Sequence, residues 1–532
     1  MARYRYEHFG YAPPPELSGR ACPARYPVVI VGAGPTGLSM AIDLALRGVA
    51  SIVLDDNDVV SVGSRAICWA KRTLEIFDRL GVGERMVAKG VTWKIGRLYH
   101  GDKEVYNFDL LPEGGHKMPA FINLQQYYVE QYLVERARDF PDLIDLRFKN
   151  KVVDVEKMAG GAAAAVETPD GSYRIEADYL LACDGAKSTV RSALGLEFAG
   201  RLFEERFLIA DVELKADFPS ERRFWFEPTF HAGESALLHK QPDDIYRIDL
   251  QLGWDADPEV EKRPENVIPR IEKVLGRSDF EIDWVSVYTF QCRRMERFVH
   301  DRVIFLGDSA HIVSPFGARG GNGGIQDVDN LGWKLAAAIK GEAPAALLAT
   351  YDDERIHGAD ENIANSARAT NFMTPKSPME KMLRDEILDL AADMAFARKL
   401  VNSGRLSVPC SLAASALQTA SPDAVLEPGA ACLDAPLQKD GAGAWLLGQL
   451  NEGFTLLSFG DRPRVEANDL RHVHVARPGE GALQDVSGHA FRRYGEDLTY
   501  LIRPDQHVAA CFRMPDAAAI RAAHQRALGR EV

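Results

Sequence analysis

The sequence predicts an α/β protein of more than one domain, with a buried parallel sheet near its N-terminus and a largely antiparallel sheet in its middle part. The first observation is the apolar run Val28 to Val31, which leads through a glycine turn into an amphipathic helix that ends near Gly48. The second is the period-two alternation of short segments over residues 202–292. The third is the length of 532 residues, which exceeds one hydrophobic core and indicates two to four domains.

The glycine turn after this first strand predicts a phosphate-binding site. Its pattern, GxGxxG, consists of Gly32, Gly34 and Gly37 and includes Pro35 and Thr36 at the start of the helix. Gly32 permits the tight turn, Gly34 lets the backbone approach a pyrophosphate, and Gly37 allows the helix to pack closely on the strand. The helix N-terminus presents free N–H groups and a partial positive charge to the phosphates.

A second apolar run, residues 52–54, ends in Asp55, eighteen residues after Gly37. An acid at about this distance binds the ribose hydroxyls of a dinucleotide. The two features together predict a dinucleotide site and leave NAD and FAD equally open. Arg65 follows in the next loop, where its guanidinium either meets a cofactor phosphate or is solvated.

Helical and β patterns alternate along the next part of the chain. Leu74, Phe77 and Leu80 recur at helical spacing before Gly81. Further predicted elements are a β-hairpin over 91–108, a helix over 123–140, a β-meander over 152–175 and a buried strand over 179–183. This last strand delivers Asp184 to its carboxyl end, which is the edge where ligands bind in an open α/β sheet.

The antiparallel region carries one polar strand face. In YRIDLQL, residues 246–252, period-two alternation puts Arg247, Asp249 and Gln251 on one face and apolar residues on the other. This polar face is either exposed to solvent or the wall of a polar ligand chamber. Taken in isolation, the strand favours solvent.

A third buried strand, residues 303–306, ends at Gly307 and Asp308. A glycine-dense loop over 317–324 follows, and then a helix that starts near Ile325. Strand, acid, glycine loop and helix N-terminus again make an anion cradle. A protein needs two such cradles for one dinucleotide only when that molecule is long and bent.

Composition restricts the possible partners. The chain is 46% apolar and 26% charged, and no apolar run is long enough to span a membrane. A net charge of −14 argues against a nucleic-acid or anionic-membrane partner. Residues 1–26 have no signal-peptide pattern and are interpreted as an extended leader, so we expect a cytoplasmic protein. Seven scattered cysteines without a CxxC pair indicate neither a disulfide framework nor a zinc or other metal site.

Three motifs in this order resemble the FAD-dependent aromatic-ring hydroxylases of the para-hydroxybenzoate hydroxylase type, the group A flavin monooxygenases. They are GAGPTG with its distant acid, CDGAKSTVR at residues 183–191, and GDSAH followed by a proline, glycines and an asparagine at residues 307–322. The resemblance covers Pro27 to Asn365. It implies FAD, bound tightly without a covalent link, and NADPH or NADH as a transient reductant.

This resemblance assigns cofactor contacts residue by residue. Asp308 would anchor the ribityl chain, because the first glycine turn holds only the ADP half of FAD. Asp184 would serve both FAD and NAD(P)H, with Arg191 supporting its loop. The implied FAD-binding residues are Gly32, Gly34, Pro35, Thr36, Gly37, Asp55, Arg65, Gln126, Asp184, Gly307, Asp308, Gly320, Gly321 and Asn322. Asp56 departs from the family, which often has Arg or Lys there.

The resemblance also implies a catalytic region. Pro315 corresponds to the proline whose carbonyl lies near the reacting ring, and His311 is interpreted as structural. Arg247 and Asp249 align with the strand that faces this ring, which reverses the preference for solvent. The implied substrate residues are Phe224 and Phe226 (alternatively Trp225), Arg247, Asp249, Gln251 and Gln291, with Arg293 beside them. No residue is identified as the base that deprotonates the substrate.

The activity implied is hydroxylation of a phenolic ring by NAD(P)H and O₂ through a C4a-hydroperoxyflavin. SRAICWAKR, NLQQYYVE and the C-terminal region most resemble members of the 3-(3-hydroxyphenyl)propionate hydroxylase type. A bulky polyketide or a nitrogen heterocycle remains open as the substrate. The alternatives are a related flavoprotein, such as a halogenase or a reductase, and a flavin-binding sensor without turnover.

The predicted domains are discontinuous. Residues 1–90, 123–200 and 293–400 form the FAD domain, including a helix over 380–400, and residues 91–122 and 201–292 form the substrate sheet. Residues 401–532, with strands at 454–460 and 500–511, resemble a thioredoxin-like domain that lacks CxxC. Packing, oligomer contacts or a cap are the roles considered for this domain. A homodimer is the expected assembly.

Overall fold

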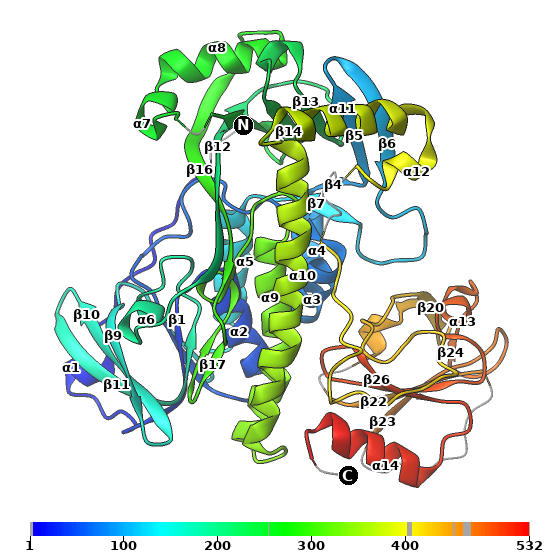
Figure 1. The fold of residues 1–532 in the computed structure, drawn as a ribbon. Helices are drawn as coiled ribbons and strands as arrows, with labels where there is room; N and C mark the ends of the chain where they lie inside the picture. Colours follow the sequence, from blue (N-terminus) through cyan, green and yellow to red (C-terminus); the bar gives the residue numbers. More distant parts are fainter. Residues whose placement is uncertain (1–3, 254, 402–406, 451–452, 461–469, 531–532) are drawn as a thin grey trace.

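The computed structural model describes residues 4–253, 255–401, 407–450, 453–460 and 470–530. Figure 1 shows a sheet covered by helices, a second sheet above it, and a C-terminal unit coloured orange and red at its side. The fold is a mixed α/β fold with several sheets, as the sequence predicts.

The first sheet has a parallel centre in the order β17-β18-β11-β1-β2-β8. Its strands are β17 (Val299–His300), β18 (Val303–Phe305), β11 (Gly171–Ala182), β1 (Tyr26–Val31), β2 (Ser51–Leu54) and β8 (Ile144–Arg147). The apolar run of β1 is fully buried, because both of its neighbours are parallel strands and helices cover the sheet. Helix α2 (Pro35–Leu46) packs against α5 (Gln126–Ala137) and α9 (Gly320–Ile339).

The segments predicted as a meander and as a separate buried strand are joined in one long strand, β11. Its first part pairs antiparallel with β10 (Gly161–Thr168), which pairs with β9 (Lys151–Met158). Its last part runs parallel to β1, with Tyr179 opposite Val28. The same strand therefore belongs to a surface hairpin and to the nucleotide sheet, which local periodicity alone does not indicate.

The second sheet is mostly antiparallel, in the order β19-β16-β12-β15-β14-β13-β5-β6. Its strands are β5 (Ile95–His100), β6 (Lys103–Asp109), β12 (Ala199–Glu213), β13 (Arg222–Phe226), β14 (Ser235–Lys240), β15 (Ile245–Leu252), β16 (Glu281–Arg294) and β19 (His311–Ile312). Ile248 and Leu250 of β15 pack with Val267 and Ile271 of α8 (Pro264–Leu275). The alternate residues of β15, including Arg247 and Asp249, consequently face the other way.

A third, small sheet lies between the other two. It contains β3 (Cys68–Ala70), β7 (Phe121–Asn123) and β4 (Val91–Trp93). The hairpin predicted over 91–108 is therefore shorter, with strands β5 and β6 around Gly101, and its first three residues pair with β7 instead. The predicted helix before Gly81 is α3 (Lys71–Arg79), and Gly83 starts the next helix, α4 (Gly83–Lys89).

Two predicted helix boundaries are wrong. Helix α9 starts at Gly320, so most of the glycine-dense segment forms its first turns and is not a loop. The helix predicted over 380–400 is two helices, α11 (Pro378–Asp393) and α12 (Ala395–Arg398), because Met394 between them is extended. The longest helix of the described residues, α10 (Ala349–Met373), has no counterpart among the predicted elements, because its polar and apolar residues give little periodicity.

The C-terminal unit contains a four-stranded sheet in the order β23-β22-β25-β26. Strands β22 (Thr455–Phe459) and β23 (Arg471–Val475) are parallel, and β25 (Thr499–Ile502) is antiparallel to β22 and to β26 (Val508–Phe512). The predicted strand at 500–511 is therefore two strands with a turn between them. Helix α14 (Ala517–Ala527) packs on one face of this thioredoxin-like sheet, and α13 (His489–Tyr494) packs in the core on the other.

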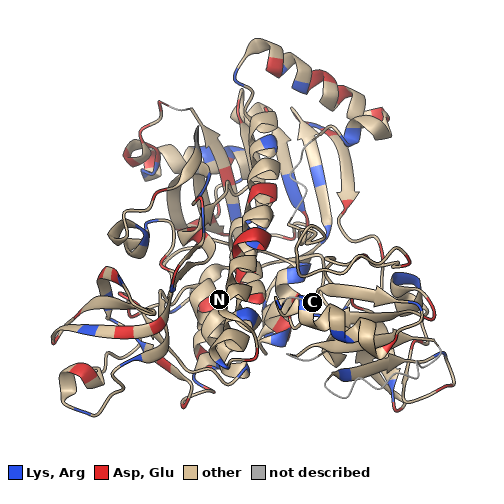
Figure 2. Cartoon of the chain, turned by 60° about the horizontal axis from the view of Figure 1, so that its bottom comes forward, with Lys and Arg blue, Asp and Glu red and all other residues tan. Residues whose placement is uncertain are grey.

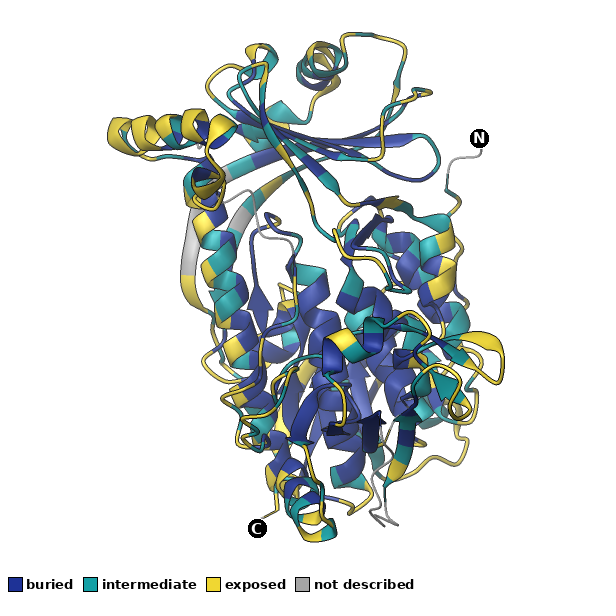
Figure 3. Ribbon diagram, turned by 90° about the vertical axis from the view of Figure 1, so that its right-hand side faces the viewer, coloured by how far each residue is buried: buried dark blue, intermediate teal, exposed yellow. Residues whose placement is uncertain are grey.

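Burial and charge follow this layering. Figure 3 shows that the elements of the first sheet and the helices beside it are mostly buried, while the projecting helices are exposed. Figure 2 shows acidic and basic residues interspersed over all parts of the chain, so the net charge of −14 is spread out. Within the described ranges, no helix is long and apolar enough to cross a membrane.

Candidate active site

A cavity of about 890 Å³ lies between the carboxyl edge of the first sheet and the polar face of the second. Its wall includes Gly32 and Asp55 beside β1 and β2, and Arg222 and His239 on β13 and β14. One continuous space therefore joins the predicted nucleotide turn to the predicted substrate sheet.

The glycine turn has the geometry that a phosphate cradle needs. Gly32 has a φ of +105°, and a Cβ there would lie 2.5 Å from the carbonyl oxygen of Cys183. A Cβ on Gly37 would lie 1.9 Å from the carbonyl oxygen of Gly32, so helix α2 packs directly on the turn. A Cβ on Gly34 would meet nothing within 4 Å, and this residue, with Pro35 and Thr36, lines the cavity. Backbone at Gly34 is thus open to a ligand.

Asp55 lies at the cavity wall at the end of β2. Its carboxylate accepts hydrogen bonds from the backbone N–H of Ala33 at 2.6 Å and of Asn57 at 2.9 Å. Burial raises the pKa of this carboxyl, although both hydrogen bonds oppose the shift. Asp56 accepts from the amide of Asn57 at 2.7 Å, so the residue that departs from the family stabilises the same turn.

Asp184 presents an unsatisfied oxygen. Its Oδ2 accepts from the N–H of Val190 at 3.1 Å, while its buried Oδ1 has no hydrogen-bond partner among the described residues. Burial raises the pKa of this carboxyl. Arg191 donates to the carbonyl oxygens of Ala186 at 2.7 Å and Ser309 at 2.9 Å, which ties the Asp184 loop to the segment after β18. A free acceptor in a fixed loop suits a ligand hydroxyl or N–H group.

The loop before β3 is held by α5. Gln126 accepts from the N–H of Ala66 at 3.1 Å and donates to Glu130 at 2.8 Å, and Glu130 accepts from the hydroxyl of Ser61 at 2.7 Å. Both α5 side chains line the cavity. Sequence reasoning missed Glu130, which lies one helical turn after Gln126. The exposed Arg65 reaches the cavity from this loop.

Asp308 opens into the cavity beside the first turn of α9. Its surroundings raise its pKa, chiefly through burial and also through Asp327, while His311 and Arg65 oppose the shift. His311 is buried and shares a hydrogen bond of 2.7 Å with Asp327, whose carboxylate also accepts from the N–H of Gly307 at 2.9 Å. This geometry gives His311 a partner away from the cavity.

The start of α9 forms the next part of the wall. Gly320, Gly321 and Asn322 line the cavity, and the first N–H groups of a helix lack partners inside the helix. The side chain of Asn322 is already occupied: it accepts from the N–H of Ala70 and donates to the carbonyl of Cys68, both at 2.9 Å. Asn322 therefore joins α9 to β3, and only backbone remains for a ligand at this residue.

Several predicted catalytic and substrate residues also meet here. Arg247 donates to Asp249 at 2.8 Å and to the carbonyl of Arg65 at 2.9 Å, and all three residues line the cavity. Pro315 lines it too, and its carbonyl accepts from the N–H of Ala318 at 3.0 Å. Arg247 and Asp249 of the polar face of β15 thus face the chamber and not bulk solvent.

Four predicted substrate residues do not border the cavity in the described structure: Phe224, Phe226, Gln251 and Gln291. Phe224 and Phe226 pack instead in a core with Met373 of α10 and Leu388 of α11. The alternative residue, Trp225, stacks on Tyr99 at a centroid distance of 5.3 Å. These placements differ from the prediction because the second sheet extends beyond the cavity, and helices cover the remainder of the same face.

Sequence reasoning missed other wall residues, including Ser64, Cys68, Arg222 and His239. A signal existed for two of them. Arg222 lies two residues before Phe224 on β13, and His239 lies two residues after Leu237 on β14. Because side chains two apart in a strand share a face, period-two analysis places both Arg222 and His239 on the chamber face. Cys68 and Ser64 lie in a short strand and a loop, where no period reveals the face.

Comparisons with known proteins agree with this geometry. The family described as an FAD binding domain matches residues 25–366. A flavin-dependent monooxygenase of Mycobacteroides abscessus is 34% identical over 381 residues, 68% of this chain and 78% of the relative. A 3-(3-hydroxy-phenyl)propionate/3-hydroxycinnamic acid hydroxylase of Burkholderia cenocepacia is 27% identical over 539 residues, 95% of this chain and 97% of that protein.

A solved structure matches nearly the whole chain. The structure of an anhydrotetracycline hydroxylase from Streptomyces rimosus is 28% identical, with a TM-score of 0.72, and the match covers 96% of this chain and 100% of that one. The likeness includes the C-terminal unit, which the family match over 25–366 does not reach.

Proposed function

This chain belongs to the FAD binding domain family and is an FAD-dependent aromatic monooxygenase, and from that premise we propose that it hydroxylates a phenol with NAD(P)H and O₂. One observation supports the proposal most strongly. A single cavity reaches from a glycine cradle to the polar face of a substrate sheet, so a long cofactor fits with one end at each.

The residues present fit FAD. Gly34 is open to a pyrophosphate, the Oδ1 of Asp184, unpaired among the described residues, offers an acceptor, and Asp308 lines the cavity. In this proposal Asp55 would hold the adenosine ribose, Asp308 the ribityl chain, and the N-terminus of α9 the pyrimidine edge of the flavin. Asn322 and Gln126 would act through the loops that they fix.

Bound FAD would supply the redox chemistry, taking electrons from NAD(P)H and delivering one atom of O₂ to the ring. The chain itself would provide three things. The second sheet would shield part of the cavity from water, Arg247 and Asp249 of β15 would orient the ring, and the positive end of α9 would stabilise negative charge near it. Pro315 and the Arg247–Asp249 pair are the residues proposed to lie nearest the reacting carbon.

The experiment is a substrate panel on purified protein. We expect a yellow protein that oxidises NADH or NADPH slowly alone and at least ~10-fold faster with a suitable phenol, with a hydroxylated product identified by mass spectrometry. A halogenase or a reductase would give a different product, and a sensor would bind flavin without turnover. If no phenol accelerates flavin reduction and no hydroxylated product forms, the proposal is wrong.

Two further expectations belong to this proposal: a cytoplasmic location and a homodimer. Cell fractionation and light scattering at several protein concentrations measure them. Membrane association, or a monomer throughout the concentration range, would contradict them without affecting the proposed reaction.

A further inference from the structure

Arg222 is a buried cation without a counter-ion. Its side chain is on the chamber wall and the residue is 7% exposed. Its Nε has no hydrogen-bond partner, and no carboxylate of the described residues lies within salt-bridge distance of its guanidinium. Burial lowers the pKa of the group, against smaller opposing effects of Cys68 and Asp249. A buried charge left in this state destabilises the folded protein.

Several other buried arginines of the described residues are paired with a carboxylate. Arg247 contacts Asp249 at 2.8 Å, Arg355 contacts Asp327 at 2.6 Å, and Arg503 contacts Glu354 at 2.6 Å. Even the sequence neighbour Arg223, on the opposite face of β13, contacts Glu221 at 2.8 Å. Arg222 therefore differs from these arginines in having no acid of its own, and it differs at the wall of the active-site cavity.

A cross-strand row surrounds it. The register pairs Arg223 with Leu238, so the next pair on β13 and β14 is Arg222 and His239, and β14 pairs His239 with Arg247 of β15. Directly opposite side chains in such a row have Cβ atoms about 4.5–5.5 Å apart. The row thus places a free guanidinium, an imidazole and a paired guanidinium side by side on the chamber wall.

His239 strengthens the site as a neutral donor. It is 4% exposed, and its Nδ1 has no hydrogen-bond partner in the part of the chain that the structure describes. Burial, together with the charges of Arg222 and Arg247, holds its pKa well below the usual range, so the imidazole stays uncharged. A neutral imidazole donates one hydrogen bond from a ring N–H group. Arg222 can therefore offer the parallel N–H donors of its guanidinium, and His239 one further N–H donor, to a single ligand group.

We propose that Arg222, with His239, binds a carboxylate of the substrate, and that the substrate class is therefore a phenolic acid. This inference rests on the proposed function. A carboxylate is planar, accepts two parallel N–H bonds from a guanidinium, and is ionised at neutral pH. A phenol, with a pKa near 10, is neutral in solution and does not supply a permanent counter-ion.

The test compares acids with their amides on the holoenzyme. The ligands are phenols whose carboxylate is zero to two methylenes from the ring, 3-(3-hydroxyphenyl)propionate among them, each paired with its carboxamide. The dissociation constant is read from the change in the flavin absorption spectrum, and turnover from NAD(P)H oxidation. We expect the best acid to bind about 10- to 100-fold more tightly than its amide, the range for hydrogen bonds to a charged group.

Three variants locate the effect. Arg222→Met should weaken binding of the acid far more than binding of its amide, and so remove the preference for the acid, with FAD content retained. Arg222→Lys should retain part of this preference because a point charge replaces the fork. Arg223→Met is the matched control, since its side chain lies on the other face and pairs with Glu221. It should leave the preference for the acid intact.

Several results would overturn the inference. They are equal binding of acid and amide by the wild-type protein, equal weakening of both ligands in the Arg222 variants, and loss of FAD from an otherwise folded Arg222→Met protein. Arg222→Lys provides the test if the methionine variant does not fold. Hydroxylation of neutral phenols without any advantage for acids refutes only the substrate class, whereas no hydroxylation of any phenol refutes the proposed function.

Discussion

At the scale of single residues, the site depends on polar side chains whose partners come from distant parts of the chain. One carboxylate oxygen of Asp184 has no hydrogen-bond partner among the described residues. The side-chain amide of Asn322 hydrogen-bonds through both its oxygen and its nitrogen to the backbone of β3. Asp211 of β12 is completely buried next to the cavity wall. It accepts hydrogen bonds from the Ser64 hydroxyl and, at 3.1 Å, from the amide of Gln241. Its ionisation is therefore coupled to folding.

Asp211 predicts a pH-dependent stability. Burial raises its pKa to about 7, with Asp249 and Asp283 adding to the shift and Arg247 and Ser64 opposing it. The folded state therefore binds this proton more tightly than the unfolded state, whose Asp pKa is about 3.9, and this contribution to stability is lost as the pH rises from about 4 to 7.

The measurement is urea unfolding of the wild type and of Asp211→Asn at pH 5 and pH 7.5. Asparagine keeps the shape but does not ionise. The free energy of unfolding of the wild type should fall by about 2–3 kcal/mol relative to the variant over this interval. Asp142→Asn, at an exposed position, is the control. Parallel pH curves for wild type and Asp211→Asn would contradict this prediction.

At the scale of elements, the glycines at the N-termini of α2 and α9 have different structural roles. Helix α2 packs so closely on its turn that Gly37 touches Gly32, while Gly34 faces open cavity. Helix α9 begins with glycines because Gly324 and Gly307 both lie against Thr36, which leaves no room for side chains between the two cradles. At the start of α2, Gly37 is therefore needed for packing, whereas Gly34, the residue before the helix, is open to a ligand.

Two matched substitutions in α2 test this separation. Gly37→Ala should destabilise the FAD-free protein by about 3 kcal/mol or more, because its Cβ would lie 1.9 Å from a backbone oxygen. Gly34→Ala should change stability by less than about 1 kcal/mol, yet weaken FAD binding, because the methyl group occupies the phosphate approach. Thermal unfolding and flavin fluorescence titration measure the two effects. Equal losses of stability and of FAD affinity in the two variants would refute the separation of roles between Gly34 and Gly37.

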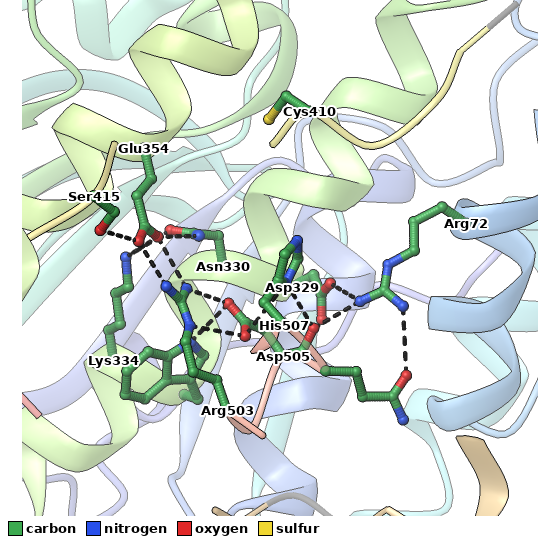
Figure 4. Close-up of polar contacts among 12 residues, drawn as sticks. Arg72, Asp329, Asn330, Lys334, Glu354, Cys410, Ser415, Arg503, Asp505 and His507 are labelled. Atoms are coloured by element: carbon green, nitrogen blue, oxygen red, sulfur yellow. Dashed lines mark hydrogen bonds and ion pairs between the residues drawn. The ribbon is translucent and has the colours of Figure 1, made fainter. Parts of the chain in front are cut away.

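At the scale of the whole molecule, a buried ionic network fixes the C-terminal unit to the nucleotide part (Figure 4). Arg503, after β25, makes two hydrogen bonds to Glu354 of α10, at 2.6 and 2.9 Å, and Lys334 of α9 contacts Glu354 at 2.7 Å. Arg72 of α3 donates to the carbonyl of Asp505 at 2.6 Å. The network lowers the pKa of Glu354 well below its usual range, and burial lowers that of Lys334 to about 8.

Loss of one partner in this network should be costly. Arg503→Met removes one of the two cations that contact Glu354 among the described residues and leaves Lys334 with the neutral donors Asn330 and Ser415. We expect a loss of about 3–5 kcal/mol in the free energy of unfolding. Arg513→Met is the control, because that arginine is exposed and lies 4.0 Å from Asp423. Calorimetry of both variants provides the measurement. An unchanged unfolding transition in Arg503→Met would show that the Arg503–Glu354 ion pair does not stabilise the fold.

Local sequence patterns determined much of this protein. Buried runs, glycine spacing and acids at strand ends gave β1, β2, β18 and the order of the cradle residues, because backbone geometry at a tight turn admits few residue types. The same patterns placed Arg247 and Asp249 on one strand face. The thioredoxin-like C-terminal unit was predicted from its resemblance to related proteins and not from local patterns, and its helix and strand limits were not predicted.

Only the tertiary structure decided which of these residues share the cavity. Phe224 and Phe226 have the right parity but lie under α10 and α11, while Arg222, on the same strand, reaches the chamber. The joining of Arg72, Glu354 and Arg503 likewise depends on how three distant segments pack. Period and spacing specify a face of an element, but what covers that face is set by long-range packing, whose partners are far apart along the chain.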